Sequence, residues 1–374
     1  MKLFPTQEVG SLSRAPFLKK ITEKSIEETK KWGELLRVEE LDKLLSILNK
    51  KRINEDDMII LYDYASLFAI RFFESAGLDV IWDGEQKRVE MYEHPLRYVE
   101  GFTFLGTVKV WDAEFYRKGA FINSPKLVKP YHLDEFLYVK SKARREIKIP
   151  LTGPYTLADW SFDEYYIKKY LSMDDILEAR LKAKEEMTID IAKNIIRPNI
   201  ISLVEAGAYR IQIDEPAVTS KPWEVPVMVE ALNESIKGVN VKVTLHVCYS
   251  DYTKLFPHIA EAKIHQISIE CANRDTREMG INDEKRIGYG IIEYFREYTP
   301  WLEVAPGVID VHTDFIEPPE LVRDRLVYSA KKHGDESKII TCNDCGLRTR
   351  SWPIAYQKEK NMVEGANLAR KLFS

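Results

Sequence analysis

Residues 241–248 read VKVTLHVC, an apolar run that ends in a histidine and a cysteine. Two further runs have the same form, RIQIDE at residues 210–215 and QISIEC at residues 266–271. Near-continuous Val, Ile and Leu runs are typical of parallel strands that are covered on both faces. We therefore predict three parallel strands here, each of which ends in ionisable side chains.

Five more runs of this kind occur in the chain, and helical segments separate most of them. Alternation of short strands with long helical segments indicates βα units and a parallel sheet. The eight expected strands cover residues 8–12, 79–84, 147–156, 210–215, 241–248, 266–271, 304–312 and 338–344. The expected helices cover residues 25–48, 55–74, 173–205, 223–236, 252–263, 283–298 and 318–332. Eight βα units in one chain predict an α/β fold of the (β/α)8 TIM barrel type.

The predicted barrel carries two additions. Residues 102–123 read as a β-hairpin inserted after the second unit, and extra helices lie near the N-terminus. We expect one domain over residues 1–374, because no low-complexity linker divides the chain. The alternative is a doubly wound open sheet, which is disfavoured because no GxGxxG motif follows the first strand.

Composition and charge exclude several classes of protein. Of the 374 residues, 45% are hydrophobic and 30% are charged, which rules out a disordered chain. Lys and Arg number 55 against 59 Asp and Glu, so there is no overall basic field for a nucleic acid or an anionic membrane. No apolar run reaches the ~18 residues of a membrane helix, and the first residues, MKLFPTQEVGS, do not have the form of a secretory signal. We expect a cytoplasmic globular protein with no nucleic-acid or membrane partner.

The carboxyl ends of the predicted strands hold the candidates for chemistry. In a (β/α)8 barrel the active site is built at these ends. They read GS at residues 10–11, DGE at 83–85, GP at 153–154, DEP at 214–216, HVC at 246–248, EC at 270–271, DVH at 310–312 and DCG at 344–346. Core strands have no structural use for so many charges, because an unpaired buried charge is costly. The pattern therefore predicts an active site at this edge of the sheet.

A metal site is the most specific of these predictions. His246 and Cys248 are two residues apart on a strand, so their side chains point the same way. With Glu270 on the next strand and Cys345 on the last, they offer the four N, S and O ligands of a tetrahedral zinc site. The alternative is that each is a packed strand residue, but four such side chains at matched strand ends favour the metal.

The other two cysteines are expected to be buried thiols. Cys342 and Cys345 form a CxxC, which alone suggests a redox pair or half of a zinc knuckle, but no second CxxC exists. Cys271 follows Glu270 directly and so faces the opposite side of its strand.

The predicted ligand set also indicates the type of reaction. Sulfur-rich ligation favours the activation of an external thiol over hydrolysis, because a zinc hydrolase needs a bound water and a nearby general base.

Taken together, these segments resemble the C-terminal catalytic barrel of cobalamin-independent methionine synthase. The matching segments are VGSL at residues 9–12, DGE at 83–85, GPYTLADWSF at 153–162, IQIDEPA at 211–217, LHVCYSDY at 245–252, SIECANR at 268–274, PGVIDVHT at 306–313 and DCGLRTR at 344–350. The resemblance implies a zinc-dependent methyltransferase that transfers a methyl group to the thiol of homocysteine and forms methionine. It carries the family's zinc ligands onto His246, Cys248, Glu270 and Cys345.

The resemblance also implies an amino-acid pocket. The family's homocysteine-contacting positions match Val9, Gly10, Ser11, Glu85 and Asp214. The chemistry of the residues agrees, because the ammonium group of homocysteine requires carboxylates such as Glu85 and Asp214. Backbone N–H groups near Gly10 and Ser11 can hold its carboxylate.

Three further residues receive roles in the reaction. The proton-donor histidine of the family matches His312, and the aromatic side chain that its members use against methylfolate matches Trp160. Asp310 and His312 would face the same side of their strand, so we predict that the two side chains form a hydrogen-bonded acid–base pair.

The methyl-donor half of the family pattern does not match this chain. Full-length members of the family carry a second, N-terminal barrel that this sequence lacks. The segment at residues 124–129, SPKLVK, has no counterpart of a folate-contacting Arg-Cys pair, and Ser220 stands where the family has a glutamate. We therefore expect the methyl donor to be a corrinoid or a modified pterin, free or bound to a protein. A separate chain is a candidate for supplying the missing half.

Two other functions remain open at this point. An epoxyalkane–coenzyme M transferase, or another thiol alkyltransferase, also uses a zinc-activated thiol. Coenzyme M has a sulfonate and no ammonium group, so it would leave Glu85 and Asp214 without a positive partner. A non-catalytic zinc protein would use the metal only to hold the fold together, and homocysteine would not exchange with one of its ligands.

Overall fold

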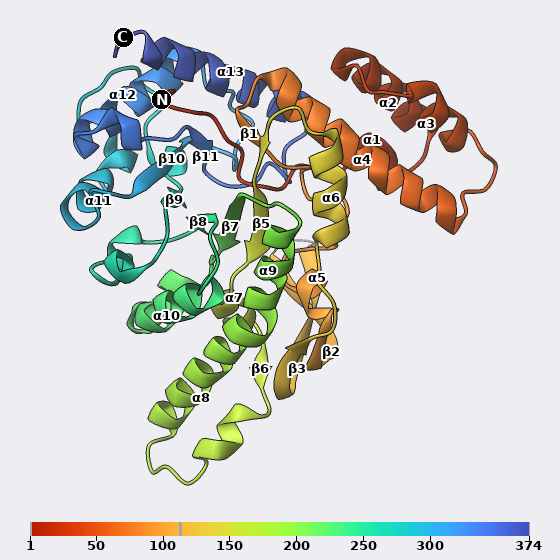
Figure 1. Cartoon of the computed structure of the whole chain (residues 1–374). Helices are drawn as coiled ribbons and strands as arrows, with labels where there is room; N and C mark the ends of the chain where they lie inside the picture. Colours follow the sequence, from red (N-terminus) through yellow and green to blue (C-terminus); the bar gives the residue numbers. More distant parts are fainter. Residues whose placement is uncertain (1, 112–113, 374) are drawn as a thin grey trace. The chain divides into compact units, whose positions relative to one another are not determined.

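The computed structural model describes residues 2–111 and 114–373, which form two compact units (Figure 1). Unit 1 comprises Met1–Lys87, Glu135–Ile149 and Ser268–Ser374. Unit 2 comprises Arg88–Asp134 and Pro150–Ile267. Both units contain helices and strands, and two of the four unit boundaries fall within β5 (Ile149–Thr152) and β9 (Gln266–Ile269). The fold class is therefore α/β, as predicted.

Unit 2 contains strands whose ends carry several of the predicted site residues. Its sheet has the order β5-β7-β8-β9, with β7 at Arg210–Asp214 and β8 at Lys242–Val247. β7 and β8 pair in parallel along their whole length. Every residue of β8 after the first is buried, as expected of a strand that is covered on both faces.

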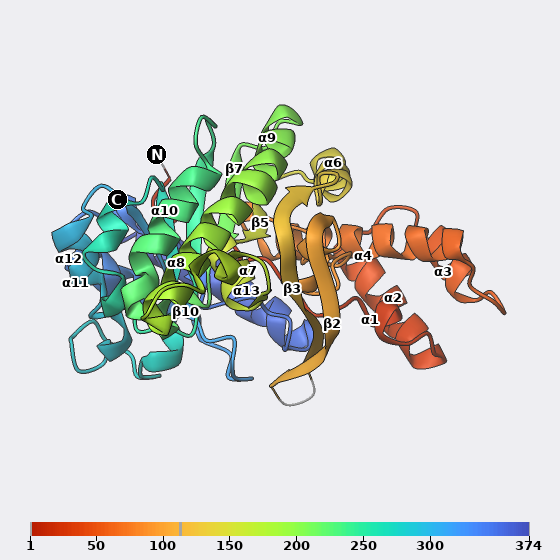
Figure 2. The same cartoon turned by 90° about the horizontal axis from the view of Figure 1, so that it is seen from below.

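The predicted hairpin is confirmed, and it lies in unit 2. β2 (Val99–Trp111) and β3 (Glu114–Leu127) pair antiparallel and run side by side in Figure 2. Residues 112 and 113, which the hairpin prediction includes, lie outside the described residues. β6 (Phe162–Asp163) adds a strand parallel to β3. The helices of this unit are α5 (Glu93–Leu96), α7 (Pro154–Asp159), α8 (Ile176–Ile191), α9 (Arg197–Glu205) and α10 (Val225–Ser235).

Unit 1 contains two pairs of parallel strands. β1 (Val80–Ile81) pairs with β4 (Glu146–Ile147), and β10 (Glu303–Ile309) pairs with β11 (Cys342–Asn343). The first predicted strand, residues 8–12, is reduced to one isolated bridge, from Leu12 to Leu347. The helices are α1 (Pro16–Lys19), α2 (Glu23–Leu36), α3 (Leu41–Leu48), α4 (Glu55–Ala76), α6 (Leu133–Lys142), α11 (Ile292–Tyr298), α12 (Pro319–His333) and α13 (Trp352–Arg370). The expected extra N-terminal helices are therefore present as α1 to α4.

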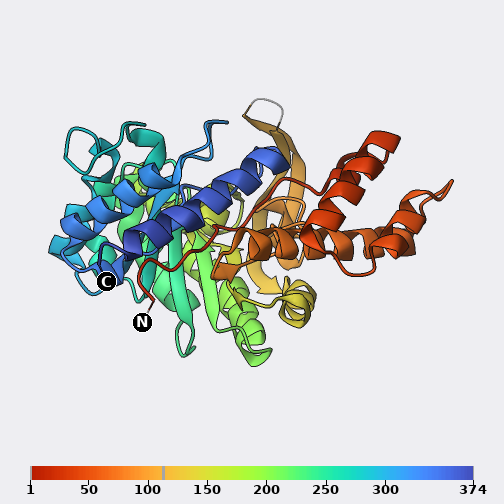
Figure 3. The same cartoon turned by 90° about the horizontal axis from the view of Figure 1, so that it is seen from above.

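The two ends of the chain meet within unit 1 (Figure 3). The rings of Phe4 and Phe373 lie edge to face, with centroids 5.3 Å apart. Arg370, at the end of α13, donates from Nε to the carbonyl oxygen of Leu3 at 2.7 Å and from Nη2 to that of Phe4 at 2.6 Å. The last helix thereby anchors the start of the segment that leads to residues 9–11.

One predicted strand is too long. Residues 147–156 divide into β4, β5 and the first turn of α7. Gly153 is extended as the N-cap of α7, and Pro154 occupies its first turn, where a missing N–H breaks no helical hydrogen bond. The strand therefore stops before Pro154, and a short helix carries the chain onward to Trp160.

The predicted helices at residues 25–48, 173–205, 252–263 and 283–298 are each broken or shortened. Arg37 takes the left-handed conformation that ends α2, so the first segment forms two helices. A π-helical turn at Ala192–Ile196 separates α8 from α9. Pro257, which has no N–H to continue a helix, divides the third segment into two short 3-10 turns. The fourth segment is helical only over α11.

Candidate active site

The end of β8 carries His246 and Cys248, two of the predicted ligands. His246 lies within the strand and Cys248 follows its last residue, so the period of two directs both side chains to the same side. Both residues are buried, with 2% and 6% of their surface exposed. An imidazole and a thiol are therefore held next to each other on one strand, which is the first half of the predicted donor set.

Asp214, the predicted ammonium partner, lies at the end of β7 in the same unit. It is directly opposite His246 in the register of the two strands. The side-chain Nε2 of Gln212 donates to Asp214 Oδ1 at 2.7 Å, which fixes the direction of the carboxylate. The structure thus brings a predicted substrate-binding residue beside a predicted metal ligand, as adjacent parallel strands require.

Glu215, the next residue, has a role that our sequence reasoning did not identify. Its carboxylate accepts N–H bonds from Tyr155 at 3.0 Å and Thr156 at 2.7 Å, and the Thr156 hydroxyl donates to it at 2.6 Å. A Cβ on Gly153 would lie 2.1 Å from Glu215 Oε1, so only glycine fits there. Burial raises the pKa of the Glu215 carboxyl to about 7. The DEP motif therefore joins the end of β7 to the start of α7.

Trp160 follows α7 directly and is half-buried. The ring of Tyr92 lies 6.3 Å from the Trp160 ring, at an interplanar angle of 55°. The preceding residue, Asp159, accepts hydrogen bonds from Lys184 at 2.5 Å and from Lys221 at 2.7 Å. This charged cluster was not predicted, because its lysines are distant in sequence, and it fixes the end of the helix beside Trp160.

In unit 1, Glu270 and His312 are in contact. Glu270 lies just beyond β9 and is buried, and its Oε1 is 3.0 Å from Nε2 of His312. The side chain of Asn273 donates to the other oxygen, Oε2, at 3.1 Å. The hydrogen bond to Glu270 raises the pKa of His312, which favours the protonated imidazole. Both oxygens of the Glu270 carboxylate are thus oriented by neighbouring side chains.

The predicted pairing of the Asp310 and His312 side chains is wrong. Asp310 Oδ1 accepts the backbone N–H of His312 at 2.9 Å, whereas the imidazole contacts Glu270. The chain turns directly after β10, which ends at Ile309, so the alternation of a strand no longer applies at these two residues. Asp310 therefore shapes the turn that presents the histidine.

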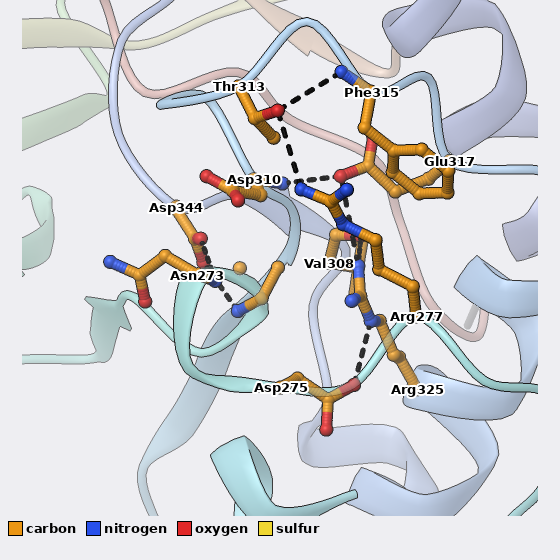
Figure 4. Close-up of polar contacts among 12 residues, drawn as sticks. Asn273, Asp275, Arg277, Val308, Asp310, Thr313, Phe315, Glu317, Arg325 and Asp344 are labelled. Carbon is orange, nitrogen blue, oxygen red and sulfur yellow. Dashed lines mark hydrogen bonds and ion pairs between the residues drawn. The ribbon is translucent and has the colours of Figure 1, made fainter. Parts of the chain in front are cut away.

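Asp344, which our sequence reasoning also did not single out, is buried immediately before Cys345. Its Oδ1 accepts the N–H groups of Cys271 at 2.7 Å and Ala272 at 2.9 Å, and its Oδ2 accepts that of Asn273 at 2.7 Å. Figure 4 shows the carboxylate directed at this turn. Burial raises the pKa of the Asp344 carboxyl to about 8, and the nearby Glu270 adds to the shift.

The four cysteines, all of which lie in the described part of the chain, form no disulfide. Cys345 is partly exposed, whereas Cys342 is fully buried near Gln7 and Ser268. Burial raises the pKa of the Cys342 thiol to about 11 and also raises that of Cys271. These environments agree with the prediction that Cys342 and Cys271 are free, buried thiols.

The residues of unit 1 that are predicted to bind the amino acid lie on two neighbouring segments, residues 9–11 and the segment of Glu85, which are joined by the hydrogen bond from the Leu12 N–H to the Gly84 carbonyl oxygen. Ser11 accepts a backbone hydrogen bond from Leu347 at 2.7 Å, and a Cβ on Gly346 would lie 2.0 Å from the Ser11 hydroxyl. Glu85 has a positive φ of 56°, an unfavourable conformation for a residue with a side chain. Such a backbone is retained where surrounding contacts demand it, and it is frequent at functional sites.

The donor chemistry identifies which side chains could hold a metal. His246 and Cys248 in unit 2 and Cys345 in unit 1 carry ligand atoms of the kind that bind a metal. One imidazole and two thiols are nitrogen and sulfur donors, which suit zinc better than they suit magnesium or calcium. Glu270, the fourth predicted ligand, has one carboxylate oxygen in contact with His312 and the other with Asn273.

Comparison with known proteins identifies the family. The family model described as "Cobalamin-independent synthase, Catalytic domain" matches residues 37–368. The methionine synthase of Thermoplasma acidophilum is 37% identical over 97% of this chain and 97% of its own length. The chain belongs to the cobalamin-independent methionine synthase family. The resemblance found in the sequence motifs is therefore confirmed.

Other relatives support the assignment to the methionine synthase family. The methionine synthase of Thermococcus kodakarensis is 37% identical over 86% of each chain. A solved structure of a B12-independent methionine synthase from Shewanella sp. W3-18-1, in complex with selenomethionine, has a TM-score of 0.76 and 23% identity, and 99% of each chain is covered. That likeness supports the fold. The protein is accordingly an enzyme, a methyltransferase of the methionine synthase type.

The helices within residues 2–111 and 114–373 are too short or too polar to span a lipid bilayer.

Proposed function

We propose that this enzyme is zinc-dependent and methylates the thiol of homocysteine to give methionine. The proposal rests chiefly on the donor set of His246, Cys248 and Cys345, in a chain that belongs to the methionine synthase family. These three side chains, with Glu270, would hold the zinc. A zinc ion bound there lowers the pKa of a thiol and keeps it as a thiolate nucleophile at neutral pH.

The amino-acid part of the substrate would be held by side chains at other strand ends. We assign Glu85 and Asp214 to the ammonium group of homocysteine, and the backbone of Val9, Gly10 and Ser11 to its carboxylate. Charge-assisted hydrogen bonds of this kind are the strong ones, and they fix the direction of the substrate. The fixed carboxylate of Asp214 supports this assignment.

His312 is the residue that we assign to proton exchange. The homocysteine thiol loses a proton as its sulfur is methylated, and a donor of the pterin type takes up a proton when it leaves. The contact of His312 with Glu270 supports this role, because the carboxylate orients the imidazole. Asp310 has an indirect role, since it accepts the backbone N–H of the histidine.

The methyl donor is proposed to be a corrinoid or a modified pterin, free or carried by a protein. Trp160 offers a flat surface for such a group. Ser220, however, directs its hydroxyl to the carbonyl oxygen of Ala217 at 2.7 Å and supplies no carboxylate for a pterin edge. A site without that partner discriminates less strongly for plain methylfolate. A second chain is a candidate for covering the donor side.

The finer features of the fold are also part of the proposal. We propose that the chain forms one domain, residues 1–374, in which eight strands close into a (β/α)8 barrel. The bridges from Thr6 to Thr341 and from Gln7 to Val80 support closure through the N-terminal segment. We also propose a cytoplasmic location, because a zinc thiolate site needs reduced cysteines and the cytosol keeps thiols reduced.

Methionine formation from homocysteine tests the proposed function. Purified enzyme would be assayed with methylcobalamin, methyltetrahydrofolate and its polyglutamates, before and after removal of zinc by a chelator. We expect turnover that is lost without zinc, is restored by zinc, and is faster with the corrinoid. Full activity of metal-free enzyme would refute the zinc proposal, and a kcat/KM of ~10⁴ M⁻¹s⁻¹ or more with plain methyltetrahydrofolate would refute the donor proposal. Alkylation of coenzyme M in place of homocysteine would support the alkyltransferase.

A further inference from the structure

Asp344 connects the two proposed ligands of unit 1. It directly precedes Cys345, and its carboxylate accepts the N–H groups of the three residues that follow Glu270. Cys271, Ala272 and Asn273 precede Asp344 by 73, 72 and 71 residues in the sequence. Strand β10 lies between β11 and β9 in the sheet, so no strand pairing joins β11 directly to the turn after β9, and the Asp344 side chain makes that direct link.

The carboxylate reaches this turn because the strand between them carries a glycine. A Cβ on Gly307, in β10, would lie 2.0 Å from Asp344 Oδ1 and 2.5 Å from the Asp344 Cα. Any larger residue would displace the carboxylate. The position of Gly307 is itself fixed, because its carbonyl oxygen accepts the hydroxyl of buried Tyr289 at 2.7 Å.

The contact continues to the Glu270 side chain. Asn273, whose N–H is held by Asp344 Oδ2, donates from its own side chain to Glu270 Oε2 at 3.1 Å. The far end of the turn is anchored by a buried ion pair, in which Arg325 Nε donates to Asp275 Oδ2 at 3.0 Å (Figure 4). The turn is thus held at both ends: Arg325 holds Asp275 at the far end, and Asp344 holds the residues that follow Glu270 at the near end.

We propose that Asp344 is a positioning residue that sets Glu270 and Cys345 in the arrangement in which they bind metal. This inference rests on the proposed zinc site. Groups that orient metal ligands without touching the metal change metal affinity by about 10- to 100-fold when they are removed. Asp344→Asn keeps the size of the side chain but turns one acceptor oxygen into a donor, so at least one of the three N–H groups loses its partner.

The test compares Asp344→Asn with Glu215→Gln. Glu215 is the matched control, because it is also a buried carboxylate that accepts successive backbone N–H groups beside a glycine, but it holds the start of α7. Zinc affinity would be measured by competition with a chromophoric chelator, and the ligand field by the absorption spectrum of the cobalt-substituted protein. We expect a 10- to 100-fold weaker affinity and a changed spectrum for Asp344→Asn, and an affinity within about twofold of wild type for Glu215→Gln.

Other results would overturn the inference. An Asp344→Asn affinity within about twofold of wild type, or an equal loss in Glu215→Gln, would show that Asp344 does not position the ligands. If Asp344→Asn does not fold, Asp344→Ser replaces it, because a hydroxyl oxygen cannot accept all three N–H groups and adds no bulk beside Gly307, and the same loss is expected. A wild-type protein that binds no stoichiometric zinc would refute the proposed function as well, whereas wild-type binding with an unaffected Asp344→Asn would refute this inference alone.

Discussion

Replacement of Lys358 by methionine should destabilise the enzyme strongly, although the residue is not one of the predicted ligands. Lys358 lies on α13, and neither it nor Glu317 exposes any side-chain surface. Its ammonium group donates to Glu317 Oε2 at 2.8 Å, to the carbonyl oxygen of Asp310 at 2.9 Å and to that of Phe315. One lysine therefore satisfies three acceptors of the loop that carries His312.

The expected magnitude follows from what the substitution leaves behind. Removal of one partner of a buried ion pair costs about 3–5 kcal/mol, because the other charge stays buried without compensation. Glu317 would keep two partners, the N–H of Asp310 at 2.8 Å and the guanidinium of Arg325 at 3.9 Å. We therefore expect the free energy of unfolding to fall by about 3 kcal/mol, the lower end of that range.

Denaturant unfolding, followed by circular dichroism, measures this loss. Lys360→Met is the matched control on the same helix, because Lys360 is exposed, and its effect should stay within about 0.5 kcal/mol. In the double variant Glu317→Gln with Lys358→Met the unpaired carboxylate is gone, so its destabilisation should be smaller than the sum of the two single effects.

Two results would refute this reasoning. A loss of less than about 1 kcal/mol in Lys358→Met would mean that the ammonium group does not compensate buried Glu317. Additivity of Glu317→Gln and Lys358→Met within about 0.5 kcal/mol would show that the two side chains are not energetically coupled.

Three further predictions concern other parts of the molecule. Cys345→Ser should lose its zinc while Cys342→Ser keeps it, as measured by metal analysis of the purified proteins; the reverse result would overturn the ligand assignment. Asp214→Asn should raise the KM for homocysteine by about 30-fold or more, since truncating a desolvated charge pair costs roughly 2–5 kcal/mol, and an unchanged KM would reject the pocket. Burial raises the pKa of Glu359 to about 8, so the folded state keeps a proton that the unfolded chain releases near pH 4.5, and stability falls as the pH rises through that window. Glu359→Gln should flatten this fall by at most ~1.4 kcal/mol per pH unit in denaturant unfolding between pH 5 and 8, and an unchanged slope would contradict the shift.

The placement of His246 and Cys248 at the end of one strand could be predicted from the sequence. A strand fixes the direction of its side chains by its period of two, so the placement of His246 and Cys248 needs no information from the rest of the chain. Apolar runs that end in charged residues likewise mark the ends of parallel strands, and β7 and β8 end where the pattern predicts, at Asp214 and beside Cys248. The same motifs are specific enough to indicate the family by themselves.

Predictions from local sequence patterns failed where the backbone departs from regular strand geometry. The predicted strand at residues 147–156 contains Gly153 and Pro154, which start a helix once Glu215 is available to accept its first N–H groups. The predicted side-chain pair of Asp310 and His312 failed because the chain turns after β10. In both cases the deciding partner lies more than 40 residues away, at separations of 60 for Glu215 and 42 for Glu270.

Only the tertiary structure could show how the site is supported. Asp344 reaches the turn after β9 because Gly307, on the strand between them, has no side chain, and nothing in the sequence near either residue encodes that passage. Lys358 contacts the loop of His312 only because α13 packs where its ammonium group meets three acceptors. Short-range patterns record the period of a helix or strand, whereas a buried carboxylate or ammonium group takes its partners from whichever segments the packed core brings within hydrogen-bond distance.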